Sequence, residues 1–468
     1  MHGPLPNGSA RRRFVVKSAQ LQVAGTLGQL HDQYAASGVP IQVSFRDLVP
    51  KLGDGNRGTH YLHPYPAKLL AQIPHLLLTS IVAGDRSISV LDPFCGSGTT
   101  LLEAALLGFD ATGIDVNPLA AMIARAKCRP LRPQQLVDIG AEAVSLARVL
   151  PLRDAADPPE WPNLGHWYSR KAIEQLRRLL GAIARVATDT YRDALLLAFS
   201  VAARRVSFAD PRVPVPVRVD ASRATTAALR QRFRAVQDRA EQGEAIAEFS
   251  SALQRMAVQF SDLRRRSRAM AVGSVSVRIH DARRDYPSAI RNRGPFDVVV
   301  TSPPYVAAQK YVRSSLLSLI WLGLVPSKDL AELESRTIGR EHVRRMSSVL
   351  LGPSMPAWLH TQISEIATKN PTRAAIATAY ANDMASAISQ TARCLRPGGR
   401  AYFVVADCQV AGQLFPVTRL VAQLASDHGL AQDLHVSDRI ANRGLQTSRR
   451  ADSSVIGAEH VLGFTRQS

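Results

Sequence analysis

The chain has 468 residues, of which 46% are hydrophobic and 21% charged, so it can bury a sizeable core and has the composition of a globular protein. Its apolar runs are far shorter than a membrane span, the arginines at 11–13 are not followed by the apolar stretch of a signal peptide, and its four cysteines show no CxxC spacing. These features argue against membrane, disulfide-framework and zinc-site proteins and favour a cytoplasmic one, while the formal charge of +20 predicts a polyanionic partner.

Residues 1–58 are polar and basic for most of their length, and we expect an N-terminal extension there. They lead into His63-Pro64-Tyr65-Pro66, which we call the HPYP element. Its two prolines favour extended or turn geometry before a helix that is predicted from Ala67 to Leu78. The aromatic and histidine side chains of this element suit the wall of a pocket.

The first strong pattern begins with an apolar run that ends at Asp92. It continues as Pro93-Phe94-Cys95-Gly96-Ser97-Gly98-Thr99 and then as good helix formers, which predicts a strand, a glycine-rich turn and a helix. Such a turn lets a ligand approach the backbone and the unpaired N–H groups of the helix. A second apolar stretch ends in Asp115, 19 residues after Gly96, where an acidic residue of a nucleotide-binding unit accepts hydrogen bonds from a ribose.

The turn differs from the dinucleotide fingerprint, because Leu101 stands where the third glycine would be. The pattern therefore argues against a nicotinamide-dependent dehydrogenase and predicts a different ribose-bearing cofactor.

The block from 134 to 272 is mostly helical in its apolar spacing. One apolar stripe follows 173–186, and another follows 246–263 in steps of three and four, as on the buried face of one long helix. The prolines within 210–218 favour an extended loop between them. Arginines are frequent here, so we interpret 134–272 as a basic helical insertion and a candidate target-recognition region; solvated helix faces are the alternative.

Regular α/β patterning resumes at 275. One strand is predicted before Asp281, and a buried strand from Phe296 stops at Thr301-Ser302-Pro303-Pro304-Tyr305. Further strands are predicted near 400–406 and within 436–465, around a polar loop. We expect an α/β protein with a Rossmann-like sheet, divided by the insertion into a first part, 59–133, and a second part, 273–468.

Ser302 to Tyr305 lie at the carboxyl end of a strand, where open α/β sheets bind ligands. The motif suits methylation of an exocyclic amino group, whose lone pair is delocalised into the base ring. The Ser302 hydroxyl oxygen and the Pro303 carbonyl could accept the two amino hydrogens and direct the lone pair to a methyl donor, while Tyr305 stacks on the base. A base within a duplex would first have to flip out, at a cost on the order of a few kcal/mol.

Together the two motifs and the HPYP element resemble the amino-group DNA methyltransferases of bacterial restriction–modification type, over roughly 60–130 and 275–465. The resemblance implies S-adenosylmethionine as the cofactor. Its methionine end would lie on the loop formed by Asp92, Pro93, Phe94, Cys95, Gly96, Ser97, Gly98 and Thr99, its ribose on Asp115 and its adenine amino group on Asp281. Ser302, Pro303, Pro304 and Tyr305 would form the catalytic site for the target base.

The same resemblance implies site-specific methylation of double-stranded DNA in a bacterial, nucleoid-associated setting, without a metal. Residues 302–305 read Ser-Pro-Pro-Tyr, which we call the SPPY motif. In that family an SPPY motif accompanies mainly N4 methylation of cytosine. A cognate restriction endonuclease is a further candidate partner, and the oligomeric state is left open.

Three alternatives remain. The first is an N6-adenine DNA methyltransferase, and the second is an RNA methyltransferase acting on the N2 amino group of guanine. RNA enzymes of that type have a similar cofactor loop, but they usually carry an acidic residue before PPY, where this chain has Ser302. The third is an inactive nucleic-acid-binding protein on the same scaffold. The presence of both motifs in intact form argues against this alternative. A cytosine C5 enzyme would need a nucleophilic cysteine after a proline, and Cys95 is better interpreted as a packed small residue.

Overall fold

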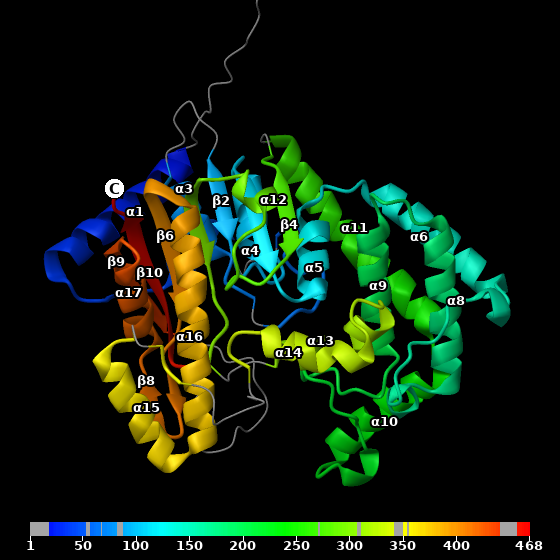
Figure 1. The fold of residues 1–468 in the computed structure, drawn as a ribbon. Coiled ribbons are helices and arrows are strands. Elements are labelled where there is room, and N and C mark those ends of the chain that lie inside the picture. The colour runs from blue at the N-terminus through cyan, green and yellow to red at the C-terminus, as the bar shows by residue number, and fades with distance from the viewer. Residues whose placement is uncertain are drawn as a thin grey trace, which may run out of the picture.

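The computed structural model describes residues 18–52, 57–66, 68–81, 88–269, 272–306, 310–340, 350–352, 355–439 and 456–468. Within these ranges, eight strands form one sheet in the order β1-β9-β10-β6-β5-β2-β3-β4 (Figure 1). Strand β10 runs antiparallel to β6 and β9, and the other neighbouring pairs are parallel. The strands are β1 (Ile41–Val43), β2 (Ser89–Asp92), β3 (Asp110–Asp115), β4 (Val275–Ile279), β5 (Phe296–Thr301), β6 (Leu395–Val405), β9 (Leu430–Arg439) and β10 (Ala458–Arg466). The expected Rossmann-like α/β sheet is confirmed.

The strand order changes direction between β2 and β5. From β2 the chain adds β3 and β4 on one side, and the later strands β5 and β6 lie on the other side. The carboxyl ends of these parallel strands meet at one edge of the sheet. Open α/β sheets bind their ligands at such a switch point, so we expect a ligand site at this edge.

Each face of the sheet carries an apolar core. Along β5, Val298 and Val300 belong to one core and Val299 to the other, as the alternation of a strand requires. The first core includes residues of α1 (Ser18–Ser37), α3 (Gln72–Thr79), α4 (Thr99–Leu106) and α5 (Pro118–Cys128); the second includes residues of α12 (Ser288–Arg291), α15 (Ala357–Lys369), α16 (Pro371–Cys394) and α17 (Val417–Asp427). The sheet is therefore covered on both sides.

The N-terminal region contributes to this sheet. Within the segment expected as an extension, β1 pairs with β9 as an edge strand. The helix predicted from Ala67 begins later, at Gln72. Residues 68–70 stay out of it, and the Lys68 ammonium donates to the carbonyl oxygens of His60 and His63. Ala67 itself lies outside the described residues.

The basic block forms a group of helices beside β4, on the right in Figure 1. They are α6 (Pro133–Val149), α7 (Leu164–Trp167), α8 (Arg170–Val186), α9 (Arg192–Arg205), α10 (Ala227–Gln242) and α11 (Ala245–Ala269). The predicted stripe on one long helix is confirmed, because Phe249, Met256 and Phe260 of α11 are buried. A Cβ atom at Gly140 would lie 2.2 Å from Leu253, so this glycine lets α6 and α11 pack closely.

Shorter elements complete the described part of the chain. They are α2 (Phe45–Leu48), α13 (Tyr311–Trp321), α14 (Leu330–Arg336), the ribbon of β7 (Cys408–Val410) and β8 (Gln413–Phe415), and the 3₁₀ turns η1 (Pro50–Leu52), η2 (Leu152–Asp154), η3 (Ala221–Arg223) and η4 (Ser327–Asp329). Helix α13 follows the SPPY motif and packs on α9 of the basic block. Among the helices described, none is both long and apolar enough for a membrane span.

Candidate functional site

The glycine-rich turn connects the end of β2 to the start of α4. Gly96 and Gly98 have φ angles of 48° and 79°, which glycine adopts without strain. A Cβ atom at Gly98 would lie 2.8 Å from the Cβ of Ala124, so Gly98 lets the turn pack on α5. A Cβ atom at Gly96 would have only the Tyr65 ring near it, at 3.9 Å, so this position faces open space beside the HPYP element.

Asp115, at the end of β3, shapes this turn. One carboxylate oxygen accepts a hydrogen bond from the backbone N–H of Gly96 at 2.9 Å, and the other accepts from that of Asn117 at 2.8 Å. Burial raises the pKa of Asp115 to about 6, although the two backbone donors oppose this shift. The side chain remains partly exposed, so it can also contact a ligand.

Asp92 connects the two sequence motifs. Its buried carboxylate accepts hydrogen bonds from the Phe94 N–H at 3.1 Å and from the Thr301 hydroxyl at 2.6 Å. Burial raises its pKa to about 6. Thr301 directly precedes Ser302, so one buried hydrogen bond joins the glycine-rich turn to the SPPY motif.

Most other side chains of the turn are turned inward. Cys95 is buried, and burial raises the pKa of its thiol, which agrees with its interpretation as a packed residue. Ser97 is also buried and accepts a hydrogen bond at 3.2 Å from Lys127, whose pKa is lowered to about 7 by burial. Pro93 and Thr99 are buried as well, whereas Phe94 is partly exposed. A ligand on this turn would meet its backbone, Phe94 and Asp115.

The SPPY motif is held by two residues that sequence reasoning missed. The Tyr305 hydroxyl donates to Glu459 of β10 at 3.2 Å, and burial raises the pKa of both side chains. A Cβ atom at Gly339 would lie 2.4 Å from the Tyr305 carbonyl oxygen, so the backbone of Gly339 lies directly against the motif. Ser302 is partly exposed at the end of β5. Neither Glu459 nor Gly339 stands in a recognisable motif, and no sequence signal could have found them.

Asp281 follows β4 at the same edge of the sheet. Its buried carboxylate is engaged by Arg283 at 2.6 Å, and Arg283 also contacts Asp383 of α16 at 2.8 Å. Burial alone would raise the pKa of Asp281, but the hydrogen bonds from Arg283 lower it. In the described ranges, no hydrogen bond joins this carboxylate to the other predicted site residues. The sequence therefore placed Asp281 at the correct edge but did not reveal its ion pair.

A buried ionic cluster supports the turn from behind. Glu103 of α4 is fully buried and accepts hydrogen bonds from His60 at 2.7 Å and His75 at 2.9 Å, with Arg57 as a third partner. Burial would raise the pKa of Glu103, but the two histidines and the charge of Arg57 hold it well below its usual range. The cluster joins the segment before the HPYP element and α3 to α4.

These positions lie at the carboxyl ends of neighbouring strands, along one edge of the sheet. The open space at Gly96 and the partly exposed Phe94 and Asp115 lie on the β2–β3 side, and Ser302 directly follows the neighbouring β5. In the ranges that the structure describes, no group of three or more His, Cys, Asp or Glu side chains suits a metal ion. The edge thus brings the glycine-rich turn and the SPPY motif together, joined by the hydrogen bond between Asp92 and Thr301.

Known proteins match this chain in its sequence. Residues 48–125 match the family model of the N6/N4 methyltransferases, described as DNA methylase. The type II methyltransferase M.MvaI of Kocuria varians is 23% identical over 86% of this chain and 88% of its own length. The type II methyltransferase M.BsoBI of Geobacillus stearothermophilus is 22% identical over 82% of this chain and 81% of its own length. Among solved structures, an rRNA methyltransferase from Streptomyces viridochromogenes is 11% identical over 90% of this chain and 96% of its own, with a TM-score of 0.32.

Proposed function

This chain is an amino-group methyltransferase of the N6/N4 DNA methylase type that uses S-adenosylmethionine, and on that premise we propose that it methylates the N4 amino group of cytosine in double-stranded DNA. The observation that supports methyl transfer to an amino group is the buried hydrogen bond between Asp92 and Thr301. It fixes a cofactor turn and an SPPY motif at the ends of adjacent strands, so a donor methyl and an acceptor amine can meet.

The residues on the donor side fit the cofactor. When bound, S-adenosylmethionine supplies an electrophilic methyl group on a sulfonium sulfur. We assign its methionine end to the open space at Gly96, where the backbone can approach closely, and its ribose to the partly exposed carboxylate of Asp115. Asp281 would accept from the adenine amino group through lone pairs that Arg283 does not use. The partly exposed Phe94 would contact the cofactor, and the remaining assigned residues of the turn would hold its shape around the cofactor: Asp92, Pro93, Cys95, Ser97, Gly98 and Thr99.

On the acceptor side, Ser302 and Pro303 are assigned to the amino group of a flipped-out base. The Ser302 oxygen and the Pro303 carbonyl accept its two hydrogens, which localises the nitrogen lone pair and aims it at the methyl carbon. Pro304 stiffens the loop, and Tyr305 stacks on the base. The hydrogen bond from Tyr305 to Glu459 fixes the direction of the ring before the base arrives.

The assignment to cytosine rests on Ser302, since SPPY accompanies mainly cytosine N4 methylation in the family that the motifs resemble. We assign target recognition to the basic helical block 134–272, which is inserted in the sequence between β3 and β4. A cognate restriction endonuclease remains a candidate partner, because the relatives that match over most of this chain are named as type II methyltransferases.

The test is methyl transfer from labelled S-adenosylmethionine to duplex plasmid DNA and, in parallel, to tRNA. We expect label in the DNA only. Label only in tRNA would contradict the DNA assignment. Binding of plasmid and cofactor without any label transfer would indicate the inactive scaffold instead.

A further inference from the structure

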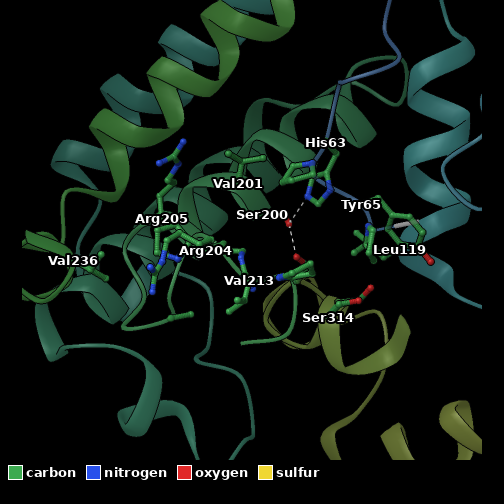
Figure 2. A pocket seen from close by; sticks show the side chains of 18 of the residues that line it. His63, Tyr65, Leu119, Ser200, Val201, Arg204, Arg205, Val213, Val236 and Ser314 are labelled. Carbon is green, nitrogen blue, oxygen red and sulfur yellow. Dashed lines mark hydrogen bonds between the residues drawn. The ribbon is translucent and has the colours of Figure 1, made fainter. Parts of the chain in front are cut away.

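A pocket lies between the HPYP element and the basic helical block. It has a volume of about 360 Å³ and is lined from α9, α10, α13, the loop after α9 and the HPYP element. Figure 2 shows Arg204 and Arg205 on one side of this pocket and His63, Tyr65 and Leu119 on the other, with Ser200 between them. This size is within the range of ligand-binding cavities.

The lining of the pocket is strongly basic. Four arginines contribute to it, Arg204, Arg205, Arg212 and Arg239, and no acidic residue is among its described lining residues. Arg212 and Arg239 are neutralised from outside by Asp210 and Glu248. Arg204 and Arg205 have no carboxylate within ion-pair distance in the described ranges, and burial lowers the pKa of Arg204. The charge of Asp210 acts on Arg204 from a distance, but neither arginine is held in an ion pair in the described ranges, and two such cations beside one cavity favour an anionic ligand.

The opposite wall offers neutral hydrogen-bonding groups and ring surfaces. His63 is 4% exposed, and its Nδ1 atom has no hydrogen-bond partner among the described residues. Burial lowers its pKa to about 3, so the ring is neutral. Its Nε2 atom lies 3.0 Å from the Ser200 hydroxyl, which donates to Ser318. Pro64, Tyr65 and Leu119 complete this wall with apolar surface, which suits a sugar ring better than a free ion.

The pocket is physically connected to the proposed active site. Asn117 donates to Ser315 of α13, a lining residue, at 3.3 Å, and to the Tyr65 hydroxyl at 3.3 Å. The Asn117 backbone N–H also donates to Asp115. Helix α13 begins six residues after Tyr305 along the chain. A strand whose target base lies against the SPPY motif would therefore have its backbone near this pocket.

Building on the proposed function, we propose that this pocket binds a phosphodiester group of the DNA strand that carries the target base. Arg204 and Arg205 neutralise the phosphate, and the ring surfaces of the HPYP element contact the adjacent deoxyribose. Arg204 also donates to the Val213 carbonyl at 2.6 Å. This hydrogen bond holds the loop after α9 in place, where it forms part of the pocket wall. Such a contact fixes the register of the strand and carries no sequence information.

The test is the salt dependence of DNA binding by the full chain. In Arg205→Gln, affinity for a duplex should fall several-fold, and the slope of log K against log salt should lose about 0.9, the value for one phosphate contact. Arg205 is exposed, so the variant should fold normally, and its S-adenosylmethionine affinity should be unchanged. Arg291→Gln, which removes the same charge from an exposed position of α12, outside both this pocket and the basic helical block, is the matched control.

An unchanged slope in Arg205→Gln, together with normal methylation by the parent protein, would overturn the phosphate pocket and leave the proposed function intact. Equal losses in Arg205→Gln and Arg291→Gln would also overturn it, because they would indicate only the overall charge. A parent protein that binds RNA but not duplex DNA would overturn both proposals.

Discussion

Charge is used differently at the sheet edge and in the helical block. At the edge, the carboxylates of Asp92, Asp115 and Glu103 are buried or partly buried and accept hydrogen bonds from the protein itself. In the helical block, Arg204 and Arg205 face a cavity without an acidic lining residue in the described part of the chain. The first region thus uses charge to fix its own geometry, and the second leaves charge available to a partner. Substitutions should affect folding and catalysis at the edge but only binding in the block.

The largest effect on folding is expected for Glu103→Gln. The change leaves Arg57 without its buried counter-charge and weakens the acceptor for His60 and His75, so the free energy of unfolding should fall by about 3–5 kcal/mol in a urea titration. Glu142→Gln, at an exposed position of α6, is the control and should change little. A loss below about 1 kcal/mol would mean that the edge does not depend on its internal charges.

Ser302→Ala should lower kcat by about 10²–10³-fold, because the amino group loses a positioned acceptor. Calorimetric titration should show an unchanged affinity for S-adenosylmethionine. Ser386→Ala, at an exposed position of α16, should be as active as the parent. A large loss of cofactor affinity with little change in turnover would contradict the acceptor role.

Asp92→Asn tests the electrostatics of the link between the motifs. Because the folded-state pKa is raised from 3.8 to about 6, the parent should lose stability as pH rises from about 4 to about 6. The asparagine keeps an acceptor oxygen for Thr301 but does not ionise. The variant should match the parent near pH 4 and exceed it above pH 6, by at most about 3 kcal/mol. Urea titrations across this range provide the measurement, and a difference independent of pH would contradict a raised pKa.

Alanine substitutions at the two glycines of the turn should have different effects on stability and on cofactor binding. Gly98→Ala brings a Cβ atom against Ala124 and should reduce stability by about 1–3 kcal/mol. Gly96→Ala meets no protein atom closely, so its smaller cost of about 1 kcal/mol comes from the positive φ angle, and it should mainly weaken cofactor binding. Thermal unfolding and cofactor titration of both variants separate these effects. Equal cofactor affinities in Gly96→Ala and the parent would place the cofactor elsewhere.

The smallest effect on folding is expected in the helical block. Arg205→Gln removes an exposed cation without an ion-pair partner in the described ranges, so stability should stay within about 0.5 kcal/mol of the parent. The same urea titration measures it. A loss comparable to that of Glu103→Gln would remove the contrast between the two regions.

The sequence predicted the parts of the site that depend on short-range patterns. The pattern of a strand, a glycine-rich turn and a helix predicts the turn after β2. An apolar strand that stops at two prolines indicates the SPPY motif. Both lie at strand ends, so a parallel sheet places them at one edge. The phosphate pocket was not predicted, because only folding brings the HPYP element, α9 and α13 together. The same holds for the contacts of Tyr305 with Glu459 and Gly339.

The assigned role of Asp281 shows a related limit. Its position after a strand could be predicted, but the link from Arg283 to Asp383 depends on where α16 packs against the sheet. Local patterns locate Asp281 and the nearby Arg283 after a strand, whereas Asp383, the second partner of Arg283, comes from a distant segment that no local pattern relates to them.

The most direct test of the account is nucleoside mass spectrometry of duplex DNA treated with the protein and S-adenosylmethionine. The account predicts N4-methylcytosine, and its absence from DNA treated in parallel with Ser302→Ala. N6-methyladenine as the modified nucleoside would contradict the cytosine assignment and the role given to Ser302.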